Sequence, residues 1–79
     1  MVRLPRDVRP NDLIRLPHKL GFETIRQTGS HVTMTHPGPP QCHIAVPDHG
    51  LVKIGTLHTI LSITSDHLKI DIDDLIQQL

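Results

Sequence analysis

The spacing of apolar residues changes along the chain, and each change predicts a new element. Residues 9–21, "RPNDLIRLPHKLG", carry apolar side chains at the spacing of one helical face. These residues are Leu13, Ile14, Leu16 and Leu20. Pro10 suits the first turn and Gly21 the end of this helix, whereas Pro17 is expected to kink or shorten it because proline has no backbone N–H.

The next two runs, residues 22–28 and 31–36, alternate between apolar and polar positions and are separated by Gly29-Ser30. A two-residue loop with glycine first is typical of a type II′ β-hairpin. Because side chains alternate along a strand, pairing about this turn assigns them to two faces. The face expected toward the core carries Ile25, Val32 and Met34. The polar face carries Arg26, Thr28, His31 and Thr33.

A third alternating run, residues 41–47 ("QCHIAVP"), predicts another strand. Its apolar face carries Cys42, Ile44 and Val46. Matching this face to that of the preceding strand requires an odd-length connection, so a loop of three or five residues, or a bulge, is expected. With that register, His43 falls on the same polar face as His31.

Two more helices are predicted in the last third of the chain. Residues 56–64 form one of them, with Thr56 as its N-cap, and a connection lengthened around "TSDH" follows. Its apolar face carries Leu57, Ile60, Leu61 and Thr64. Asp71 is expected to start a short final helix that packs through Ile72, Leu75, Ile76 and Leu79. The predicted fold is α+β: an α-β-β-β-α order with an extra C-terminal helix, and the helices on one face of a three-stranded antiparallel sheet.

Composition narrows the function classes. A chain of 79 residues forms a single domain with a thin core, so functional groups are expected on the surface. One phenylalanine, with no tyrosine or tryptophan, leaves no aromatic platform for stacking unpaired bases. Net charge is zero, although six of the eight Lys/Arg lie in residues 1–31 and four of the eight acids in residues 66–79. A single cysteine excludes an intrachain disulfide. No apolar run approaches a membrane span or a signal peptide, so a cytoplasmic protein is expected.

The seven histidines suggest metal binding, but their spacing does not. Neither a helical H-x-x-x-H pair nor a C-x-x-C pair occurs, so no metal and no cofactor is expected. Surface or loop positions are expected for His18, His49, His58 and His67, and a position at the edge of the core for His36. His31 differs because it follows a turn on the polar face of the sheet, with Arg26 across the hairpin. Imidazole can transfer protons in RNA cleavage through the 2′-hydroxyl, and the alternative is a solvated turn histidine.

Two longer stretches, "LGFETIRQTGSHVTMTH" and "VPDHGLVKIGTLHTIL", resemble the HicA (YcfA-like) family of small toxin mRNA interferases. The similarity extends over residues 11–79. It implies a fold like the double-stranded-RNA-binding domain, a metal-independent endoribonuclease that cleaves mRNA, and His31 as the catalytic histidine in a turn formed by Gly29 and Ser30. It also implies a HicB-like antitoxin that covers the active face.

Position and charge suggest that Arg26 and Lys53 contact RNA phosphates, with His43 nearby on the same face. The alternative function is a catalytically inactive RNA-binding module of the same fold. Zero net charge favours the inactive module, whereas the intact G-S-H motif favours the enzyme. The oligomeric state is left open by the sequence.

Overall fold

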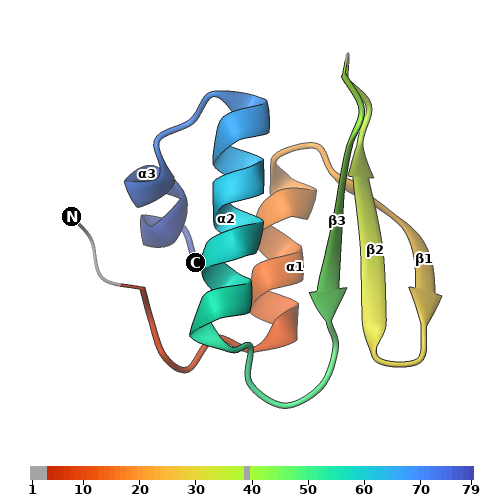
Figure 1. Ribbon diagram of the computed structural model, residues 1–79, viewed down its shortest axis with the longest axis vertical. Helices are drawn as coiled ribbons and strands as arrows, with labels where there is room; N and C mark the ends of the chain where they lie inside the picture. The colour runs from red at the N-terminus through yellow and green to blue at the C-terminus, as the bar shows by residue number, and fades with distance from the viewer. Residues whose placement is uncertain (1–3, 39) are drawn as a thin grey trace.

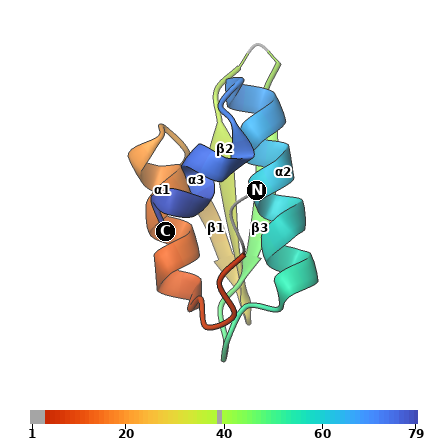
Figure 2. The same cartoon turned by 90° about the vertical axis from the view of Figure 1, so that its left-hand side faces the viewer.

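The computed structural model describes residues 4–38 and 40–79 and confirms the predicted α+β order (Figure 1). Its elements are α1 (Pro10–Lys19), β1 (Glu23–Thr28), β2 (His31–His36), β3 (Cys42–Pro47), α2 (Ile54–Leu68) and α3 (Ile72–Gln77). The strands form an antiparallel sheet in the order β1-β2-β3. Helices α1 and α2 cover one face of this sheet, and α3 lies across their far side (Figures 1 and 2). Arg3, one of the six basic residues counted in residues 1–31, and Pro39, in the predicted connection between the second and third strands, lie outside the described residues.

Helix α1 tolerates its internal proline. It begins at Pro10, as predicted, and continues through the buried Pro17 to Lys19. The carbonyl of Pro17 accepts a hydrogen bond from the Phe22 N–H (2.9 Å), which satisfies a backbone acceptor at the end of the helix. Gly21, with φ of +105°, then turns the chain into the sheet. Pro17 therefore lies in the last turn of a helix that ends two residues later.

The first hairpin has the predicted turn. Thr28 pairs with His31, and Gly29 has a φ of +54°, a conformation that glycine adopts without steric cost. The second hairpin is closed by the pair His36 and Cys42, so its connection is the five-residue loop 37–41, one of the predicted lengths. The predicted burial of Val32, Met34, Ile44 and Val46 beneath the helices is confirmed.

The predicted core position of Ile25 is wrong. A β-bulge between Thr24 and Arg26 makes Thr24, and not Ile25, the partner of Met34, and the Ile25 side chain is 54% exposed. The bulge adds one residue to β1, so the alternation of inward and outward side chains that was counted back from the turn no longer holds for the residues before Arg26. β1 is an edge strand in which every side chain is exposed, so little packing opposes this shift.

Helix α2 is longer at both ends than predicted. It begins at Ile54, and its N-cap residue is Lys53 and not Thr56. Just before the helix starts, the Val52 N–H donates a hydrogen bond to the Val8 carbonyl (2.9 Å). The segment 64–67, predicted as part of a connection, forms its last turn because no glycine or proline interrupts the helix there. The helix ends where Lys69 takes a left-handed conformation, with φ of +58°.

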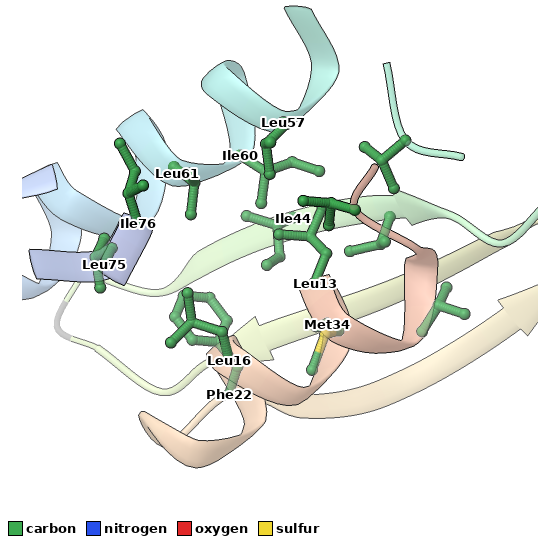
Figure 3. Close-up of a cluster of buried hydrophobic side chains, with 14 residues drawn as sticks. Leu13, Leu16, Phe22, Met34, Ile44, Leu57, Ile60, Leu61, Leu75 and Ile76 are labelled. Carbon is green, nitrogen blue, oxygen red and sulfur yellow. The ribbon is translucent and has the colours of Figure 1, made fainter. Parts of the chain in front are cut away.

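The core lies between the sheet and the helices (Figure 3). The predicted buried face of α2 is confirmed: Leu57, Ile60, Leu61 and Thr64 are all buried. The prediction that His67 is a solvated residue is wrong. Its ring is half-buried, with Nε2 2.8 Å from Nδ1 of His36, and both rings pack against Phe22. His67 is placed there because α2 continues one turn further than the sequence pattern indicated.

None of the helices in residues 4–38 and 40–79 has both the length and the apolar composition needed to cross a membrane.

Helix α3 supplies a testable capping interaction. As predicted, Asp71 precedes its first turn, and Asp71 Oδ1 accepts a hydrogen bond from the Asp73 N–H (3.0 Å). We expect Asp71→Ala to lower the free energy of unfolding by about 1 kcal/mol, measured by urea denaturation. Asp71→Asn should retain most of the stability because its side-chain oxygen also caps. Asp66→Ala, on the exposed side of α2, is the matched control. An equal loss in the Asp66 and Asp71 variants would contradict the capping role.

Candidate active site

His31 is the first residue of β2 and lies on the outer face of the sheet, which we define as the face turned away from the helices. The residues of β2 on this face are His31, Thr33 and Thr35, since Val32 and Met34 point to the core. The His31 side chain is exposed, and its Nδ1 lies 3.4 Å from the Ser30 hydroxyl. The Gly29-Ser30 turn therefore directs an accessible imidazole away from the core.

Two hydrogen bonds made by Asp48 connect this turn and the end of β1 to the end of β3. The Asp48 N–H donates to the Ser30 carbonyl (2.6 Å), and the Asp48 carboxylate accepts from Gln27 Nε2 (3.0 Å). Asp48 thereby links the end of β1, the turn before His31 and the residues after β3. Sequence reasoning assigned no role to Asp48, because its partners are distant in the chain. The predicted order of the strands could have indicated this role, because the start of β2 and the end of β3 meet at one end of an antiparallel sheet.

A depression of about 360 Å³, here called the His31 depression, opens beside this turn. Its lining residues are His31, Ala45, Pro47, His49, Leu51, Lys53 and Thr56. Lys53 reaches it because the N-terminus of α2 lies at the same end of the molecule as the β1–β2 turn (Figure 1). Lys53 also stands at the N-cap, where the helix dipole adds positive potential. The structure thus brings His31 and Lys53 together, as well as His49, which the sequence suggested was only a surface residue.

A second depression of about 570 Å³, here called the β3 groove, continues from the first between β3 and α2. Its lining residues are His43, Ile44, Ala45, Lys53, Gly55, Thr56, Thr59, Ile60 and Ile63. Ala45, Lys53 and Thr56 belong to both depressions, so the two hollows are continuous.

The other predicted contacts lie farther from His31. Arg26 pairs with Thr33, so it shares the outer face with His31 but lines neither depression. His43 pairs with Thr35, four residues along β2 from His31, or roughly 13 Å at the rise of a strand. His43 lines only the β3 groove. The structure therefore unites His31 with Lys53 but not directly with Arg26 or His43.

The ionisable side chains that line the two depressions are all basic. Lys53 and three histidines line them, and no aspartate or glutamate of the described residues does. Within the same residues, no group of three His, Cys, Asp or Glu side chains is arranged to hold a metal ion. Cys42 packs against the core, and burial raises the pKa of its thiol, which disfavours the reactive thiolate. The site is thus suited to an anionic ligand and to proton transfer by imidazole.

Comparison with protein families identifies one family for this chain. A family model described as the HicA toxin of bacterial toxin-antitoxin systems matches residues 10–64, from the start of α1 into α2 and well over half of the chain. No curated protein and no solved structure matches the chain significantly. The matched region includes the G-S-H turn, the sheet, Lys53 and both depressions. On this match, the chain belongs to the HicA toxin family of bacterial toxin-antitoxin systems.

Proposed function

We propose that this toxin is a metal-independent endoribonuclease that cleaves mRNA at the His31 depression. The single observation that carries the proposal is the meeting of His31 and Lys53 in one depression lined by no acidic residue of those described. The family supports a toxin, and the chemistry of the lining residues supports RNA as the target. Zero net charge favours the alternative, an inactive RNA-binding module, which the experiments below distinguish.

The residues can divide the reaction among them. One imidazole takes the proton of an RNA 2′-hydroxyl, whose oxygen then forms a bond to the adjacent phosphorus as the bond to the 5′-oxygen breaks. The leaving 5′-oxygen needs a proton, which a second imidazole in its protonated form can supply. His31 and His49 are the two imidazoles lining the depression. The Lys53 ammonium offsets the charge that develops on the phosphate, and the helix dipole adds to it. Arg26 holds a neighbouring phosphate along the strand.

This mechanism makes a prediction about the substrate. In the presence of EDTA, the wild-type chain is expected to cleave a single-stranded RNA and to leave a 2′,3′-cyclic phosphate. An oligonucleotide of the same sequence with 2′-O-methyl groups should stay intact, because its 2′-oxygen has no proton to lose. Denaturing gels and mass spectrometry of the products measure both results. Cleavage of the methylated strand, or activity lost with EDTA, would contradict the proposed chemistry.

RNA affinity is expected to depend on salt and on Lys53. In a His31→Ala background, which prevents cleavage, log affinity should fall linearly with log salt with a slope of about −2 to −4. Lys53→Ala should make the slope shallower by about 0.7, the value for one phosphate contact on a single strand. Lys19→Ala is the matched control, because Lys19 lines a different, smaller hollow beside the C-terminus. Fluorescence anisotropy measures the slopes, and equal slopes for the two variants would remove Lys53 from the RNA site.

Regulation follows from the family. We propose that a HicB-type antitoxin binds this chain and holds it inactive, because a toxin-antitoxin family requires an inhibitor of the toxin.

A further inference from the structure

The two edges of the sheet are built differently. β1, at one edge, carries a β-bulge and the charged residues Glu23 and Arg26. Bulges and charges are features that keep an edge strand from pairing with another chain. β3, at the other edge, reads "CHIAVP" and has no bulge and no Asp, Glu, Lys or Arg. Pro47, at the end of β3, is the one protective feature of this edge, and the rest of β3 lacks the protection that β1 has.

The β3 groove runs along this edge. Helix α2 forms its other wall and contributes the side chains of Thr59, Ile60 and Ile63. Ile63 is 39% exposed, and Leu51, in the adjoining His31 depression, is 53% exposed. Large apolar side chains gathered in a surface depression mark sites of protein contact. An edge strand facing a helix across an apolar groove is also the geometry in which extended peptides add to a sheet.

We propose that an extended segment of a partner protein binds in the β3 groove and adds to the sheet as a fourth strand beside β3. Alternate side chains of this segment are apolar and face Ile60 and Ile63. The segment also carries acidic residues, because Lys53 and histidines line the two depressions while none of the described acidic residues does. A protein segment fits this groove because the free edge of β3 offers main-chain hydrogen-bond partners and Ile63 offers an exposed apolar contact.

This mode of binding has a consequence for activity. The groove and the His31 depression share Ala45, Lys53 and Thr56, and β3 is six residues long. A strand paired along all of β3 would reach Pro47, which pairs with His31 and lines its depression. Such a segment therefore covers the site as well as the groove. Binding itself does not depend on the proposed ribonuclease activity, so the two proposals can fail separately.

The test uses a phage-displayed library of random peptides of about twelve residues as the probe, selected against the full wild-type chain. Selected peptides are expected to alternate apolar and polar residues, to include acidic ones, and to slow hydrogen exchange of β3 amides in NMR spectra. Ile63→Glu should weaken their binding at least tenfold. Ile25→Glu is the matched control, because Ile25 is an exposed isoleucine on the opposite edge, and it should change binding less than twofold. Thr59→Glu, at an exposed groove position, is a second groove variant in case Ile63→Glu lowers the melting temperature, and it should also weaken binding because its charge repels an acidic segment.

Three results would overturn the proposal. The first is a selection that yields no peptide of measurable affinity. The second is a set of peptides that protect β1 amides, or that bind both groove variants as well as they bind wild type. The third is protection of β3 by a single-stranded RNA but by no peptide, which would make the groove a nucleic-acid site. The same peptides, added to the cleavage assay, report whether groove binding blocks His31; a chain without ribonuclease activity still gives the binding result.

Discussion

Replacing His31 with alanine is expected to abolish RNA cleavage and cellular toxicity while the protein stays folded. Loss of a general acid or base costs about 10²- to 10⁴-fold in rate. The His31 side chain is exposed on the outer face of the sheet, so its removal should change the free energy of unfolding by no more than roughly 0.5 kcal/mol. The two effects differ enough to be separated by cleavage rates and thermal melts of the same purified proteins.

Two other histidine variants serve as controls for this experiment. His58 is exposed on α2 and lines neither depression, so His58→Ala should cleave at the wild-type rate. His49 lines the His31 depression, so His49→Ala should slow cleavage if it supplies the second proton transfer. If His31→Ala melts like wild type and still cleaves at the wild-type rate, His31 is only a turn residue and the inactive RNA-binding module becomes the better reading.

The largest expected loss of stability comes from Phe22→Ala. Phe22 is the only phenylalanine and is 1% exposed, with its ring centroid 5.1 Å from that of His36 and 6.1 Å from that of His67. Truncating a buried phenylalanine costs about 3–5 kcal/mol, through lost burial and the cavity left behind. Total stabilities of small domains start at about 5 kcal/mol, so we expect Phe22→Ala to retain about 0–2 kcal/mol and to be partly unfolded at room temperature.

Far-UV circular dichroism in urea measures this loss, since the chain has no tryptophan or tyrosine to report by fluorescence. Ile25→Ala is the control, because the same kind of truncation at a side chain that is 54% exposed should cost less than about 0.5 kcal/mol. Phe22→Leu should restore most of the stability by filling part of the cavity. A loss below about 1 kcal/mol for Phe22→Ala would show that this end of the core repacks freely.

The order and types of the elements could be predicted from the sequence because each depends on local features. The Gly29-Ser30 turn aligns the first two strands, since only certain residues suit a two-residue hairpin loop. Counting by twos from that turn correctly placed Val32 and Met34 in the core and His31 on the outer face. The same counting failed at Ile25, because a bulge is set by how an edge strand meets its neighbour and leaves no clear mark in the apolar pattern.

For the candidate site, the sequence by itself determined that His31 follows a tight turn and that its side chain points away from the core. It also showed which basic residues the chain offers as partners for His31. Which cation meets His31 was decided by the tertiary structure alone. Lys53 reaches the depression because α2 begins at the end of the sheet where β2 starts and β3 ends, and Asp48 holds that end together. His49 enters the site for the same reason, and Arg26, on the far edge strand, does not. Periodicity determines which face a side chain occupies, but contacts between distant segments depend on how whole elements pack, and no local pattern encodes that packing.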